Sequence, residues 1–160
     1  MLTTGEFMTL FGRAGRLHGP RLLLDAHLSR VIADETVTAC IGDAWSGPEF
    51  PEQSLCRADW LDLFTVAGFT IDGKPAERPD EPVELWRGAA HDRRQGMSWT
   101  SDRAKAEWFA ARWTQVDLDE GGSLYRTVAP PEALLCVNNG RNESEHVINP
   151  RGLHIRAESR

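Results

Sequence analysis

This chain lacks several features that would assign its class at once. Its three cysteines, Cys40, Cys56 and Cys136, are widely spaced and odd in number. They form neither a metal-ligand pair nor a disulfide framework, which is typical of a reducing compartment. We therefore expect three buried thiols that behave as small apolar side chains.

Long apolar runs and an excess of basic residues are also missing. No stretch approaches the roughly 18 apolar residues of a membrane-spanning helix, so we expect no membrane contact. The N-terminal segment has no basic opening followed by an apolar core, which predicts a cytoplasmic protein without a secretory signal. The net charge of -6 argues against general nucleic-acid binding. A local cluster of Arg87, Arg93 and Arg94 can still hold one small anion.

Phosphate-binding glycine loops and compact metal-ligand patterns are absent as well. Gly121-Gly122 stands alone, which is typical of a turn before the strand at Leu124. His91, His146 and His154 do not have the spacing of metal ligands, so no metal site is expected.

The composition that remains is that of a globular protein, with 41% hydrophobic and 26% charged residues among 160. We expect residues 1–75 to form a helical region. Apolar residues recur at helical spacing over Leu22–Ile32, and a clearer apolar stripe comprises Trp60, Leu61, Phe64 and Ala67. Ser54 is the expected cap of this second helix, and Gly68 its expected end.

The segment 72–82 holds three prolines and many charges, and it is the best candidate boundary between two regions. Beyond it, residues 83–160 alternate short strands with one helix, which predicts an α+β domain. The expected helix covers Asp102–Trp113, capped by Thr100 or Ser101. The expected strands are Val83–Trp86, Gly96–Thr100, Leu124–Val128, Ala133–Val137 and His146–Ile148.

Three short segments carry the chemistry. Leu85-Trp86-Arg87-Gly88 places a cation at the end of an apolar run. Met97-Ser98-Trp99-Thr100 places two hydroxyls on either side of an aromatic ring. Glu143-Ser144-Glu145 places two carboxylates one residue apart. Together they suit cleavage of the bond between a sugar and a nitrogen, as in the nicotinamide ribose of NAD.

That reaction makes specific demands on an enzyme. Nicotinamide leaves as a neutral amine and needs no general acid, but the ribose develops oxocarbenium character. Glu145 can stabilise this charge, with Ser98 or Thr100 donating a hydrogen bond to it. Arg87 can anchor the pyrophosphate, because its planar fork suits phosphate oxygens. Glu143 can orient the incoming nucleophile.

The ordered set WRG, GMSWT, DRAKAEWFAARW, LYRTVAPPEALLCV and RNESEHVINP resembles the mono-ADP-ribosyltransferase superfamily of the Arg-Ser-Glu class. The resemblance covers roughly residues 83–150. It implies an α+β fold with a split β-sheet core at 83–160. The resemblance does not extend to the helical residues 1–75, which we expect to pack on this core. It implies NAD as co-substrate and transfer of ADP-ribose to a target protein, with release of nicotinamide. Related small bacterial and phage proteins act as toxins, effectors or anti-defence factors.

The resemblance also implies a set of site residues. Glu145 and Glu143 match the catalytic positions, and Trp108 and Phe109 match the place of the aromatic residue beside the nicotinamide. The residues implied to bind the cofactor are Arg87, Gly88, Ser98, Trp99, Thr100 and Phe109. Trp99 departs from the pattern because it interrupts the hydroxyl motif.

Each of these residues taken singly has a simpler structural interpretation. Arg87 alone is typical of a strand-end ion pair, Ser98 and Thr100 of helix caps, and Glu143 and Glu145 of a solvated turn. Only the ordered combination favours catalysis. Two alternatives stay open: an NAD glycohydrolase, in which water replaces the acceptor, and a non-catalytic interaction module with this fold.

Overall fold

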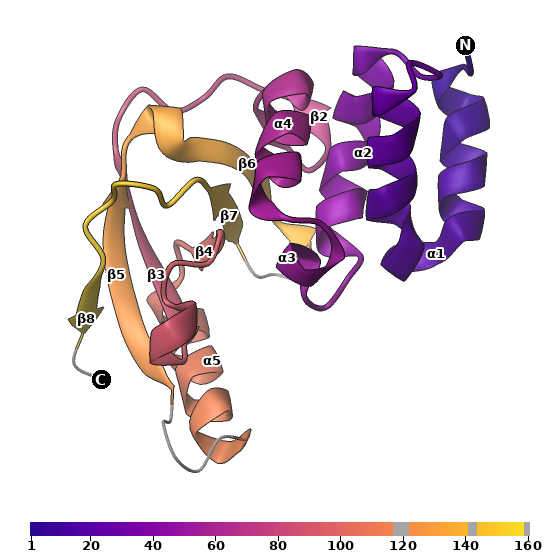
Figure 1. Cartoon of the computed structure of the whole chain (residues 1–160). Coiled ribbons are helices and arrows are strands. Elements are labelled where there is room, and N and C mark those ends of the chain that lie inside the picture. The colour runs from indigo at the N-terminus through magenta and orange to yellow at the C-terminus, as the bar shows by residue number, and fades with distance from the viewer. Residues whose placement is uncertain (117–121, 141–143, 159–160) are drawn as a thin grey trace. The chain divides into compact units, whose positions relative to one another are not determined.

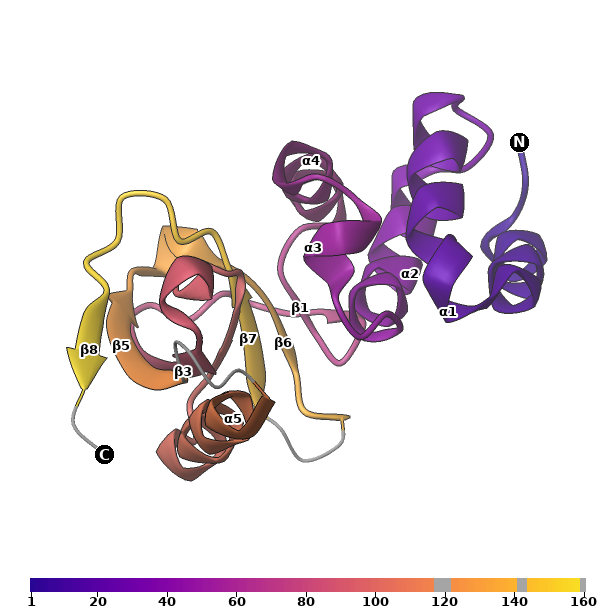
Figure 2. The same ribbon diagram turned by 60° about the horizontal axis from the view of Figure 1, so that its bottom comes forward.

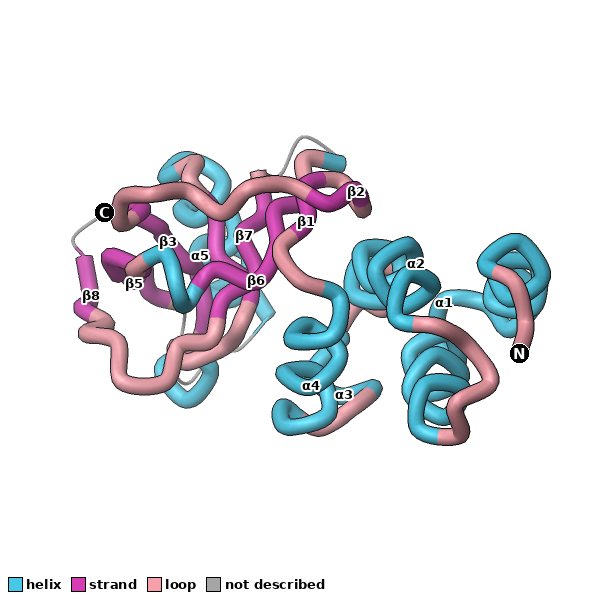
Figure 3. Tube along the Cα trace, turned by 90° about the horizontal axis from the view of Figure 1, so that it is seen from above, coloured by secondary structure: helices cyan, strands magenta, loops and turns pink. Residues whose placement is uncertain are grey.

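A computed structural model of the chain describes residues 1–116, 122–140 and 144–158. The chain divides into two compact units, Met1–Glu77 and Arg78–Arg160, and the division falls within the proline-containing segment 72–82. Helices make up most of the first unit, and most strands belong to the second (Figure 3). The expectation of an α+β protein is therefore confirmed.

The first unit contains four helices in its described residues (Figure 1): α1 (Thr4–Leu28), α2 (Asp34–Ser46), α3 (Pro51–Ser54) and α4 (Arg57–Ala67). Aromatic side chains form the centre of its core. Trp45 of α2 packs edge-on against Trp60 of α4, with ring centroids 5.0 Å apart, and Phe64 lies 5.7 Å from Trp45. All three are buried, so aromatic packing holds α2 against α4.

Helix α1 consists of two helical segments joined at Gly15, whose φ of 78° is a conformation that glycine adopts at little cost. A capping box between Thr3 and Glu6 begins the first segment. The apolar run expected to be helical over Leu22–Ile32 leaves the helix after Leu28. Arg30 takes a left-handed φ of 56°, which ends the helical path before Ile32.

Helix α4 ends where the sequence predicts but begins elsewhere. Gly68, with a φ of 70°, is its C-cap as expected. The prediction that Ser54 caps it is wrong, because Pro51 starts the separate short helix α3 that Ser54 ends, and Cys56 is the N-cap of α4. Cys56 is exposed, whereas Cys40 and Cys136 are buried, so the expectation of three buried thiols is wrong for one of them.

Strands β1 (Thr70–Ile71) and β2 (Lys74–Pro75) form a short hairpin at the start of the segment expected to be a loop. Its turn is the pair Asp72-Gly73, with φ of 51° and 76°. Positive φ at both central residues gives the twist that a two-residue hairpin turn requires.

The second unit is built on antiparallel strands in the spatial order β6-β7-β4-β3-β5-β8. Of the five expected strands, those over 124–128, 133–137 and 146–148 are found within one residue of their predicted bounds. The strand expected over Val83–Trp86 runs three residues further, and the one expected over Gly96–Thr100 begins two residues later. The edge strand β8 was not expected. The bounds are β3 (Val83–Ala89), β4 (Ser98–Thr100), β5 (Ser123–Ala129), β6 (Leu134–Asn138), β7 (Glu145–Ile148) and β8 (Arg156–Glu158).

The pairing between β3 and β4 is the narrowest join in this order. One residue pair, Trp86 with Thr100, is in register there, whereas β3 and β5 pair along seven residues. The connection between β3 and β4 is therefore thin, and better-paired strands lie on either side of it.

Helix α5 (Arg103–Val116) lies against one face of this sheet (Figure 2). A Cβ atom on Gly88 would overlap the carbonyl oxygen of Ala106 and the amide nitrogen of Ala110, so glycine permits the close approach of β3 to α5. The helix begins one residue later than expected. Asp102 caps it by accepting a 3.3 Å hydrogen bond from Lys105 N, in place of the expected Thr100 or Ser101.

Candidate active site

The strand order brings the three sequence segments together, because β3, β4 and β7 are consecutive in the sheet. One row of cross-strand partners runs through four strands: Trp86 on β3, Thr100 on β4, Glu145 on β7 and Asn138 on β6. Cross-strand partners share a face of the sheet. Gly88, two residues after Trp86, has the same face and contacts α5. Glu145 therefore lies on the face of the sheet that carries α5.

Two side chains hold the Glu145 carboxylate. Ser98 Oγ donates a 2.6 Å hydrogen bond to Oε2, and Asn138 Nδ2 donates one of 3.1 Å to Oε1. Of the two hydroxyls expected as donors to Glu145, Ser98 is thus the one that makes the contact. Thr100 Oγ1 accepts a hydrogen bond from the backbone N–H of Asp102 at 3.0 Å, so this hydroxyl stabilises the turn into α5.

Arg87 bridges β3 and β4 just beyond their single paired residue. Its Nη1 donates to Ser98 O at 2.7 Å, and its Nε donates to Arg93 O at 3.0 Å. A Cβ atom on Gly96 would overlap the guanidinium group, so the loop that leads into β4 is packed closely on it. Arg87 therefore fixes the backbone of Ser98, whose side chain holds Glu145. Because Arg87 lies between Trp86 and Gly88 on β3, its side chain leaves the sheet on the face opposite Glu145. That Arg87 also anchors a phosphate stays a prediction.

Two residues of the expected cofactor set have packing roles in this structure. Trp99 is 2% exposed and donates its indole N–H to Gly96 O at 2.8 Å, so its ring belongs to the core. Gly88 provides the close approach of β3 to α5. Trp99 presents no accessible ring face to a ligand, and Gly88 contributes through the placement of the helix. Both residues therefore support the site from within, and that they also contact NAD stays a prediction.

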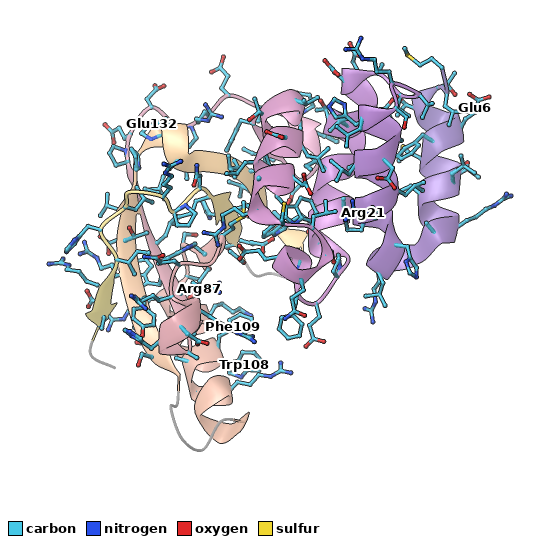
Figure 4. The ribbon with its side chains drawn as sticks, in the orientation of Figure 1. Glu6, Arg21, Arg87, Trp108, Phe109 and Glu132 are labelled. Carbon is cyan, nitrogen blue, oxygen red and sulfur yellow. The ribbon has the colours of Figure 1, made fainter. Side chains whose placement is uncertain are left out.

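The aromatic pair on α5 borders a surface hollow. Trp108 is 56% exposed, and its ring meets that of half-buried Phe109 edge-on at 5.0 Å. Both side chains project from α5 on the same side (Figure 4). The hollow has a volume of about 400 Å³ and is lined by Asp102, Ala104, Lys105, Trp108 and Phe109. This volume is large enough for a planar ring. Its first lining residue, Asp102, follows Thr100 by two positions in the sequence, and Thr100 is the cross-strand neighbour of Glu145.

The second expected carboxylate, Glu143, lies with Arg141 and Asn142 outside the described residues. The described chain resumes at Ser144, which has a left-handed φ of 45°. His146 follows Glu145 on β7 and so faces the opposite side of the sheet, as expected. Burial lowers the pKa of His146, and the opposing effects of the Ser144 carbonyl and the Glu145 charge are smaller.

The described residues contain neither a grouping of metal ligands nor a membrane-spanning helix. No three His, Cys, Asp or Glu side chains are grouped there as metal ligands would be. None of the helices among those residues has the length and apolarity needed to cross a membrane. Comparison of the chain with protein-family models, with curated protein sequences and with solved structures found no match.

Proposed function

We propose that this protein is an NAD-dependent mono-ADP-ribosyltransferase, which transfers ADP-ribose to a target protein and releases nicotinamide. The observation that carries the proposal is the hydrogen bond between Ser98 and Glu145. Two motifs that the sequence separates by 47 positions meet at 2.6 Å, on the paired strands β4 and β7, and β4 also neighbours β3, which bears Arg87. If the two motifs were only a solvated turn and a helix cap, nothing would require Ser98 and Glu145 to be in contact.

Glu145 supplies what the reaction needs most. A carboxylate held by two donors is pre-organised, so it can stabilise positive charge at the ribose without first reorienting. Nicotinamide departs without a proton, so no acid is needed next to Glu145. The hydroxyl of Ser98 and the amide of Asn138, which donate to Glu145, carry no charge, so neither of them neutralises the carboxylate.

Two further features of the second unit support the proposal of a dinucleotide. The hollow beside Phe109 and Trp108 offers aromatic edges and faces to a planar ring. Arg87 alternates with Trp86 and Gly88 along β3 and so faces the other side of the sheet, and in the proposed complex it acts by holding Ser98 in place. NAD is thus the co-substrate that we assign to this face of the second unit.

The same features support the finer fold assignment. We propose that the second unit has the split core of the ADP-ribosyltransferases. In support, the arginine is on its first strand, the Ser-Trp-Thr segment is on the next strand, and the glutamate begins a late strand that pairs with the second. The thin pairing of β3 with β4 at Trp86 and Thr100 is what a split at this point requires.

The test is incubation of the purified protein with NAD labelled in its adenylate moiety, with and without a cell lysate. Free nicotinamide and labelled protein are measured in parallel, and Glu145→Gln is the control. We expect nicotinamide release and a labelled protein only with the wild-type chain. Release without any labelled acceptor favours the glycohydrolase, and the absence of both favours the non-catalytic module.

A further inference from the structure

Asn138 is a polar residue that the sequence analysis did not identify, and it lies directly beside Glu145. It ends β6, is only 9% exposed, and is the cross-strand partner of Glu145 on β7. Its Nδ2 donates to Glu145 Oε1 at 3.1 Å. Buried amides are costly unless they are hydrogen-bonded, so this contact explains why an asparagine is tolerated here.

The side of the carboxylate that Asn138 contacts is turned toward the protein interior. Cys136, two residues earlier on β6 and fully buried, has its Sγ 3.7 Å from Asn138 Nδ2. Burial raises the pKa of the Cys136 thiol, and the charge of Glu145 raises it further. The amide of Asn138 is therefore the donor that reaches Oε1 from this interior side.

The two donors come from strands on opposite sides of β7. Ser98 is on β4 and Asn138 is on β6, and each contacts a different oxygen. One donor alone leaves the carboxylate free to turn about its terminal bond, whereas two donors on separate strands fix its plane.

We propose that Asn138 is a positioning residue for NAD cleavage, which fixes the orientation of the Glu145 carboxylate from the interior side. This inference rests on the proposed function. It assigns no contact between Asn138 and NAD, so its effect is on the chemical step and not on binding.

The first test compares Asn138→Leu with the wild-type chain in nicotinamide release. Leucine has a similar volume and no donor, so we expect kcat to fall about tenfold or more, with little change in KM for NAD. Thermal unfolding of each variant shows whether it is folded.

The second test uses Asn138→Asp. Aspartate is nearly isosteric with asparagine, so this variant is available if Asn138→Leu does not fold. Two carboxylates then share one site, and their repulsion favours retention of a proton. We expect the acidic limb of the kcat profile to move to higher pH. Asn139→Asp is the matched control, because this exposed neighbour on the chain receives the same charge just outside β6.

A readout independent of activity is the side-chain amide resonance of Asn138 in the intact protein. We expect slow hydrogen exchange of this amide in the wild type and a clear change in its shift in Glu145→Gln. If the wild type is active and folded Asn138→Leu keeps full kcat, the inference is overturned but the proposed function is not. The same holds if Asn138→Asp and Asn139→Asp have the same pH profile. A wild type that releases no nicotinamide overturns the proposed function and the inference with it.

Discussion

The hydroxyl of Ser98 and the carboxylate of Glu145 are 2.6 Å apart across the pairing of β4 with β7. The same serine accepts a hydrogen bond from Arg87 through its backbone carbonyl. Ser98 thus connects the arginine and the glutamate of the candidate site, although 58 positions separate those two residues in the sequence. A change at any of the three residues is therefore expected to affect the other two.

Glu145→Gln keeps the shape of the side chain and removes its charge. We expect nicotinamide release to fall by about a hundredfold or more, which is the loss typical of one pre-organised electrostatic group. Folding is expected to change little, because the glutamine oxygen can accept from Asn138 while its amide group donates to the Ser98 hydroxyl, which can also act as an acceptor. The measurement is nicotinamide release under saturating NAD, and full activity in the folded variant would contradict the mechanism.

Arg87→Lys replaces a planar fork by a single ammonium group. Lysine cannot serve the carbonyls of Arg93 and Ser98 together as the fork does, so we expect about tenfold weaker NAD binding. Calorimetric titration with NAD measures it. If Arg87→Lys and Arg87→Ala both bind NAD like the wild type, Arg87 has only a structural role at the strand end.

Glu143→Gln tests the division of labour between the two carboxylates. If Glu143 orients the acceptor, this variant is expected to lose labelling of the target protein while retaining slow hydrolysis of NAD, because water needs less positioning than a side-chain nucleophile. Parallel assays of transfer and hydrolysis measure this. Loss of hydrolysis as complete as in Glu145→Gln, or unchanged transfer, rules the division out.

Gly88→Ala tests the contact between β3 and α5. The added methyl group meets backbone atoms of Ala106 and Ala110, which cannot move aside as a flexible side chain does. We expect the free energy of unfolding to fall by about 1–3 kcal/mol, the usual cost of overpacking. Gly140→Ala in the same unit is the matched control, because a Cβ atom there has no neighbour within 4 Å. Equal unfolding midpoints in urea for the two variants contradict the prediction.

His146 predicts a pH dependence of stability. Its pKa is lowered by burial from the ordinary 6.5, so the unfolded chain binds its proton more readily than the folded chain. The contribution of neutral His146 to the free energy of unfolding is fully present above the pKa of the unfolded chain. It is lost as the pH falls through that value toward the lower pKa of the folded chain. We expect His146→Gln to reduce the loss of stability between about pH 7.5 and about pH 5 in urea unfolding. His154→Gln is the matched control, because it makes the same replacement at an exposed histidine.

Local patterns in the sequence determined much of the fold. Gly68 ends α4 because glycine alone accepts its left-handed φ without strain, and that property is visible in the sequence. The strand over Leu124–Val128 and the helix over Asp102–Trp113 follow from apolar spacing and caps, so they were found to within a few residues. The edge strand β8 was missed, because its residues Arg156–Glu158 carry no alternating pattern and form a strand only by pairing with β5.

The tertiary structure alone decided which residues surround Glu145. The sequence offered Ser98 and Thr100 as donors without distinguishing them, and nothing in it singled out Asn138. These choices depend on strand order and register, which join segments tens of residues apart. Pairing between distant strands is set by the packing of the whole sheet, and a one-residue shift would turn every side chain of β7 to the other face. The chemical types present were thus fixed locally, whereas their meeting at one carboxylate was fixed by long-range pairing.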